Sequence, residues 1–242
     1  MRAVRTLPSW TLVAATVLAQ IAYPLASGAV RDRLTVVTVV LFAAASLTHA
    51  LVTRGPRTAA VLVTVAGGLG LAVEAVGTAT GFPFGAYSYT GSLGPTVLGV
   101  PWVIPLAWTM MAWPAWLVAG RLARRTPVRV ALAGWALASW DVFLDPQMVD
   151  AGHWTWAGGD IPLTNYAGWL GVALVMTALL STVADRSGHD DRPMYTLYLW
   201  TYFSSVLAHA VFLDLPDSAF WGGLAMGPVA IPLAVVLWRS RR

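Results

Sequence analysis

The chain has 242 residues, of which 57% are hydrophobic and only 11% are charged, with a formal net charge of +4. Soluble domains carry about a quarter charged residues, and a soluble chain this apolar would expose large hydrophobic patches. The composition therefore excludes an ordinary soluble domain and indicates a membrane protein. The sequence has no cysteine, which excludes disulfides and thiolate chemistry, and its four histidines are too scattered to predict a metal centre.

Apolar runs of spanning length recur along the whole chain. Each run exceeds about 17 residues, the length of helix needed to cross roughly 30 Å of hydrocarbon. We predict an all-α fold, a single polytopic transmembrane helical bundle with about eight spans. The expected helices cover residues 10–30, 34–52, 58–79, 99–120, 128–145, 162–184, 194–213 and 218–238. Pro146 is expected to end the fifth helix, because the residue before a proline avoids the α region.

All fifteen basic residues are arginines, and their placement predicts the orientation of the chain. If the N-terminus lies in the cytoplasm, only Arg31 and Arg33 fall outside, which is a strong positive-inside bias. Both termini are then cytoplasmic, and the protein is a multi-pass protein of the cell membrane. Because the arginines lie between apolar runs, they predict topology and no nucleic-acid partner. The cytoplasmic arginines would be Arg2, Arg5, Arg54, Arg57, Arg121, Arg124, Arg125, Arg129, Arg186, Arg192, Arg239, Arg241 and Arg242.

Two long connections on the outer side have a different composition. Residues 80–98 and 146–161 contain no arginine and are rich in glycine, proline and aromatic residues. Glycine and proline break helices, and aromatic side chains suit a membrane interface or the lining of a site. Two interpretations stay open: a pair of re-entrant or interfacial loops, or a cover over a site that opens outward.

Three acids stand inside apolar segments, where a charge costs about 2.5–3.5 kcal/mol on insertion scales. Asp141 and Asp145 are four residues apart and share a helix face, and Glu74 lies at similar depth in the third helix. We predict that the three acids are catalytic and that Glu74 or Asp141 donates a proton. Two carboxyls close together in an apolar site cannot both ionise cheaply, so one should keep its proton, as a general acid or a proton-coupled transporter requires. A position of Asp145 at the water interface also fits the sequence.

The aromatic residues predict a binding slot for a long apolar ligand. Thirteen tryptophans are too many for an interfacial belt alone, although core packing can explain any single one. We expect the aromatic residues that cluster around the outer loops to line this slot. Asn165 is expected to hold a water molecule through its amide. The expected lining residues are Phe82, Phe84, Tyr87, Trp102, Trp140, Trp154 and Trp156.

Four motifs between Glu74 and Trp169 resemble the integral-membrane hydratases of carotenoid biosynthesis, which include the bisanhydrobacterioruberin hydratases and the γ-carotene 1′-hydroxylating enzymes. The resemblance implies addition of water to the terminal C1=C2 double bond of an acyclic carotenoid end, without a cofactor or a metal. It carries over no catalytic residues. The motifs are Gly81-Phe82-Pro83-Phe84-Gly85-Ala86-Tyr87-Ser88-Tyr89, Gly99-Val100-Pro101-Trp102, Asp141-Val142-Phe143-Leu144-Asp145-Pro146 and Ile161-Pro162-Leu163-Thr164-Asn165-Tyr166.

The physical interpretation and the resemblance lead to the same hypothesis. A protonated carboxyl would make a tertiary cation, aromatic faces and a second carboxylate would stabilise it, and water would capture it. The expected partners are a long acyclic carotenoid substrate, the lipid bilayer and other enzymes of carotenoid biosynthesis. A carotenoid end-group cyclase is the alternative enzyme. A transporter, which should show paired broken helices, or a non-catalytic carotenoid-binding protein is the alternative from another class.

Overall fold

The computed structural model describes residues 6–182 and 190–240, and these residues form a bundle of long helices. Five arginines used to predict the orientation, Arg2, Arg5, Arg186, Arg241 and Arg242, lie outside the described residues. The long helices are α2 (Leu7–Ala22), α3 (Gly28–Arg54), α6 (Ile104–Leu122), α7 (Thr126–Asp150), α8 (Leu163–Leu180), α9 (Arg192–Val211), α10 (Pro216–Arg239) and one continuous helix from Pro56 to Thr80. That helix consists of α4 (Pro56–Leu62), the π-helical segment η2 (Val63–Gly68) and α5 (Leu69–Thr80).

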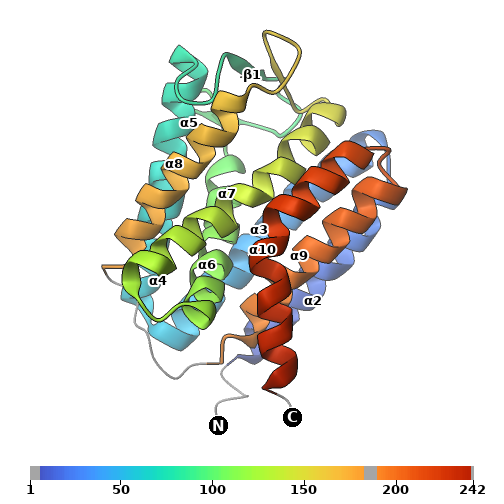
Figure 1. The fold of residues 1–242 in the computed structure, drawn as a ribbon. Helices are drawn as coiled ribbons and strands as arrows, with labels where there is room; N and C mark the ends of the chain where they lie inside the picture. The colour runs from blue at the N-terminus through green and yellow to red at the C-terminus, as the bar shows by residue number, and fades with distance from the viewer. Residues whose placement is uncertain (1–5, 183–189, 241–242) are drawn as a thin grey trace.

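Helix α6 lies at the centre of the bundle. Most of its side chains are buried, among them Trp108, Trp113 and Trp116. It contacts α3, α7, α9 and η2. Figure 1 shows α5 and α8 on one side of the bundle and α2 and α9 on the other, with α6 and α7 between them.

At two of the four prolines inside the described helices, Pro114 and Pro146, a serine side chain satisfies the carbonyl that the proline leaves free. A proline has no N–H and leaves the carbonyl four residues earlier without its helical partner. The expected end of the fifth helix at Pro146 is wrong: α7 continues to Asp150, and Ser218 donates to the Val142 carbonyl at 3.1 Å. In α6, Ser46 likewise donates at 2.8 Å to Met110, four residues before a proline.

Two predicted helix boundaries need larger corrections. The first helix does not reach residue 30, because a 3-10 turn at Tyr23–Leu25 follows α2 and α3 begins at Gly28. The fourth helix begins at Ile104, not at residue 99. The preceding residues form a small hairpin in which β2 (Thr96–Val97) pairs antiparallel with β3 (Val100–Pro101).

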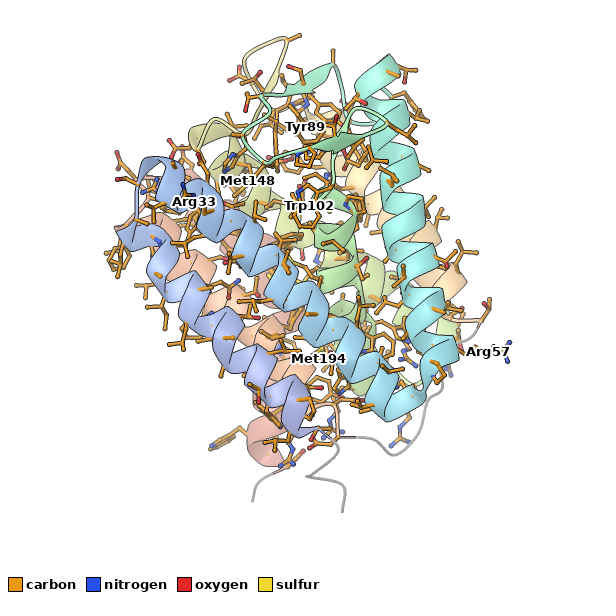
Figure 2. The ribbon with its side chains drawn as sticks, turned by 180° about the vertical axis from the view of Figure 1, so that it is seen from behind. Arg33, Arg57, Tyr89, Trp102, Met148 and Met194 are labelled. Atoms are coloured by element: carbon orange, nitrogen blue, oxygen red, sulfur yellow. The ribbon has the colours of Figure 1, made fainter. Side chains whose placement is uncertain are left out.

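The two long connections that were expected on the outer side pair with each other. Strand β1 (Tyr87–Tyr89) runs antiparallel to β4 (Trp154–Trp156), with Tyr87 opposite Trp156 and Tyr89 opposite Trp154. Figure 1 shows this pair at the end of the bundle away from both chain termini, and Figure 2 shows Tyr89 at the end opposite Arg57.

Four of the described helices are long and apolar enough to cross a membrane by length and composition. They are Gly28–Arg54, Pro56–Thr80, Leu163–Leu180 and Pro216–Arg239. The large apolar side chains that they expose, such as Phe220 and Ile231, suit contact with lipid. The predicted all-α bundle is confirmed, and these helices indicate association with a membrane.

Candidate active site

A cavity of about 1200 Å³, its open mouth included, lies between α6, α7 and the paired strands. It extends from α5 and α8 on one side of the bundle to α2 and α9 on the other. Most of its wall is apolar or aromatic. Glu74 and Asp145 are the charged residues that line it, and both lie on the side of α5 and α8.

Glu74 is buried, and three donors hold its carboxylate. Tyr87 and Tyr89 donate their hydroxyls to Oε2 at 2.6 and 2.8 Å, and the Trp108 indole donates to Oε1 at 3.2 Å. Tyrosine hydroxyls and the tryptophan indole are neutral donors. An ionised carboxylate has acceptor sites on both of its oxygens and can take all three hydrogen bonds. The three donors favour the ionised form of Glu74, whereas its burial favours the protonated form.

Asp141 and Asp145 lie one helical turn apart on α7 and form a second group of carboxyls. Asn165 of α8 uses its amide nitrogen to bridge them: it donates to Oδ2 of Asp141 at 2.9 Å and to Oδ2 of Asp145. Trp154 of β4 donates to Oδ1 of Asp145 at 3.1 Å. Oδ1 of Asp141 is buried and accepts no hydrogen bond from the described residues. The two carboxyls face each other closely enough to share a hydrogen bond when one holds a proton.

A group of stacked tryptophans forms the apolar wall beside the acids. The rings of Trp108 and Trp169 stack at 3.8 Å between centroids with an interplanar angle of 14°. Trp140 meets Trp169 edge to face at 6.3 Å. All three side chains line the cavity. Aromatic faces attract cations, so this wall suits a ligand that is apolar at rest and positive during reaction.

The paired strands close one side of the cavity and supply donors to both groups of acids. Because side chains alternate along a strand, Tyr87 and Tyr89 share one face of β1, and Trp154 and Trp156 share one face of β4. Burial, and then the neighbouring charge of Glu74, raises the pKa of Tyr89 well above its usual value. The phenol thus stays protonated and can donate. Of the two interpretations of the outer loops, the structure favours a cover over a site.

The structure gathers most of the residues expected at the site. Glu74, Asp145 and Asn165 line the same cavity. Asp141 lies behind this lining and reaches it through Asn165. The expected aromatic residues that line the cavity are Phe84, Tyr87, Trp140, Trp154 and Trp156.

Two expected lining residues lie elsewhere. Phe82 is 73% exposed, because Gly81 ends α5 in the left-handed region and the chain turns outward before Phe84 returns to the core. Trp102 is 38% exposed beside the β2–β3 hairpin and does not line the cavity. The sequence reasoning missed Tyr89. Its spacing of two from Tyr87 is the signal that would have found it, once that segment is taken as a strand.

No group of three or more histidine, aspartate or glutamate side chains among the described residues is arranged to hold a metal ion.

Comparison with known proteins gives two matches. Residues 34–226 match the model of the family described as carotenoid biosynthesis protein. The bisanhydrobacterioruberin hydratase of Haloarcula japonica is 34% identical over 124 residues, which cover 48% of this chain and 42% of the relative. The match thus spans less than half the length of that relative. No solved structure matches. Since the family model covers most of the sequence, the chain belongs to the carotenoid biosynthesis protein family.

Proposed function

We propose that the protein is a carotenoid hydratase, which adds water across the terminal C1=C2 double bond of an acyclic carotenoid end by acid catalysis. The observation that carries the proposal is the Asp141–Asp145 pair at the wall of a cavity lined by tryptophans. The family and the name of the similar hydratase support a carotenoid substrate. The reaction needs a proton donor, a wall that tolerates a cation, and water.

The count of hydrogen-bond donors indicates where the proton lies. Glu74 accepts from three donors and Asp145 from two, whereas Asp141 accepts only from Asn165. A buried carboxylate without donors is costly, so the Asp141–Asp145 pair holds one proton between its members and Glu74 stays ionised. Sequence reasoning placed the donor at Glu74 or Asp141. Because Asp145 is the member of the pair that lines the cavity, we assign delivery of the proton to Asp145.

The reaction then proceeds in two steps that balance. Asp145 gives its proton to C2, the π electrons form the new C–H bond, and a tertiary cation remains at C1. A water molecule attacks C1, and the proton that it loses returns to the Asp145 carboxylate, so the acid is restored. Between the steps both members of the pair are ionised, and their charge is stabilised by Asn165, which donates to both carboxylates, and by Trp154, which donates to Asp145.

The cation is stabilised by two features of the cavity. The faces of Trp108 and Trp169 offer π electron density, and the Glu74 carboxylate lies beside Trp108. Such groups are already oriented before the reaction, which is what makes electrostatic stabilisation effective in a dry site. To the amide of Asn165, which lines the cavity and donates to both carboxyls, we assign the orientation of the pair and of the incoming water.

We also propose how many helices of the chain cross the membrane and in which orientation. All eight long helices would span the bilayer of the cell membrane, with both termini in the cytoplasm and the paired strands on the outer side. Helices outside the four most apolar ones also expose large apolar side chains, such as Leu18 on α2 and Leu207 on α9. Arg54 and Arg57 lie at the end opposite β1, as a positive-inside orientation requires. Other carotenoid biosynthesis enzymes would supply the substrate and take up the product.

Pigment analysis tests the function directly. The chain is expressed in cells that make an acyclic carotenoid, and the extracted pigments are analysed by mass spectrometry. A hydratase adds the mass of one water per modified end, whereas an end-group cyclase leaves the mass unchanged and alters only retention and absorption. A pigment profile identical to that of cells without the chain, with the protein present in the membrane, would refute an enzymatic role on that carotenoid.

A further inference from the structure

Three side chains with an unsatisfied polar atom line the part of the cavity wall formed by α2, α3 and α9. They are Gln20, Thr38 and Thr201, and each contributes a buried oxygen that has no hydrogen-bond partner among the described residues. The Thr201 side chain belongs to a residue that is only 3% exposed. Leaving such an oxygen without a partner costs about 1–3 kcal/mol, so three on one wall need an explanation.

Helix geometry does not supply that explanation. Buried threonines elsewhere in this chain donate to the carbonyl four residues earlier in their own helix. Thr16 donates to Leu12 at 2.8 Å, and Thr109 donates to Pro105 at 2.8 Å. Thr38 and Thr201 make no such bond, although both lie within long helices. Their hydroxyls remain available to a ligand in the cavity.

The position of this wall separates it from the acids. Thr201 lies ten residues before the outer end of α9, about 15 Å along the helix axis, and Asp145 lies five residues, about 8 Å, before the outer end of α7. The charged residues that line the cavity are both on the opposite side, on α5 and α7. The wall of α2, α3 and α9 is therefore polar and neutral.

The donor and acceptor types identify the ligand chemistry. A threonine hydroxyl can donate, and the Gln20 Oε1 atom can only accept. A ligand that satisfies both must accept one hydrogen bond and donate another without carrying a charge, which describes a hydroxyl group. Ser204 and Ser205 of α9 line the same part of the cavity and add to its polar character.

We propose that Gln20, Thr38 and Thr201 form a hydroxyl subsite, which binds a neutral O–H group in the cavity that holds the acids. The identity of the ligand rests on the proposed function. Hydration consumes a water molecule and produces a tertiary alcohol, so the O–H group belongs either to water held for the attack or to an alcohol already present on the carotenoid. The two sources predict different effects of replacing these side chains.

The test replaces Thr201 by valine, which keeps the shape of the side chain and removes its hydroxyl. Thr16→Val is the matched control, because Thr16 is buried in α2, does not line the cavity and satisfies its hydroxyl within its helix. Each variant is purified from membranes that contain an acyclic hydrocarbon carotenoid and its mono-hydroxylated form. The ratio of the two pigments that copurify is measured, together with the hydration rate on each.

If the subsite binds an alcohol on the carotenoid, Thr201→Val lowers the retained ratio of hydroxylated to hydrocarbon pigment by about two- to tenfold, the effect of one neutral hydrogen bond. If it holds water, the ratio is unchanged and the hydration rate falls on both pigments by a similar factor. Ratio and rates equal to those of the Thr16→Val control overturn the subsite. Thr38→Val and Gln20→Leu repeat the test if the first variant is poorly folded. A ratio that shifts in a protein that hydrates neither pigment would retain the subsite and reject the proposed function.

Discussion

Replacing Asp141 by asparagine separates acid chemistry from structure at the carboxyl pair. In the native site, Oδ2 of Asp141 accepts from Asn165, and Oδ1 accepts no bond from the described residues. An asparagine oxygen can keep the first bond while its nitrogen takes the place of Oδ1 and donates to Asp145. The amide thus imitates the protonated form of Asp141 with the same shape but without an acidic proton. We expect no loss of hydrogen bonds and a change in unfolding free energy below about 1 kcal/mol.

The same substitution should stop the reaction. With a permanent donor at position 141, Asp145 gains a third donor beside Trp154 and Asn165 and stays an ionised acceptor, so the pair no longer holds a transferable proton. General acid catalysis contributes about 10²–10⁴-fold, and we expect Asp141→Asn to lower the hydration rate by that factor. The assay measures initial hydration of an acyclic carotenoid in isolated membranes, normalised to the amount of folded protein.

Asp145→Asn provides the contrasting variant. Its amide nitrogen must face either the Trp154 indole or the Asn165 amide, and both groups donate at this position. One hydrogen bond is lost and a buried donor is left unsatisfied, which costs about 1–3 kcal/mol. We therefore expect Asp145→Asn to be inactive and less stable in thermal unfolding, and Asp141→Asn to be inactive but stable. An Asp141→Asn variant that hydrates at a tenth of the native rate or faster would refute the shared-proton reasoning.

Two further predictions follow from the backbone and the topology. Gly70→Ala should destabilise the protein by about 1–3 kcal/mol, because the added Cβ would lie 2.7 Å from Cδ1 of Trp108, whereas Gly68→Ala meets no atom within 4 Å and should be neutral in thermal unfolding. A cysteine at Ser92 should react with an impermeant thiol reagent in intact cells, and a cysteine at Ser240 should react only after permeabilisation; the reverse pattern would invert the proposed orientation.

Most of the fold could be predicted from the apolar segments, and the family could be predicted from the motifs. The lengths of the apolar runs predicted the number of long helices, and the family inferred from the motifs is confirmed by the family model. The helix end expected at Pro146 failed because the rule for proline is local. The serine that satisfies the freed carbonyl comes from α10, 76 residues away, and no local pattern reveals it.

The candidate site, like the fold, could be predicted from the sequence only in part. The spacing of Asp141 and Asp145 places them on one helix face, which a sequence shows directly. Three of the five donors to Glu74 and Asp145 come from β1 and β4, and their arrangement depends on the pairing of two connections about 65 residues apart. Phe82 was expected to line the cavity because aromatic residues cluster there in sequence. The left-handed turn at Gly81 decides which members of the cluster point inward.

Because β1 pairs with β4, the hydrogen bonds to two separate acids, Glu74 and Asp145, depend on the same pair of strands. Tyr89 holds Glu74, its cross-strand neighbour Trp154 holds Asp145, and the two rings meet edge to face at 5.7 Å. A shift of either strand would loosen the donors of both carboxyls together. Substitutions in one connection should therefore alter the charge balance at an acid that they never touch, and the two segments are expected to vary in concert among related chains.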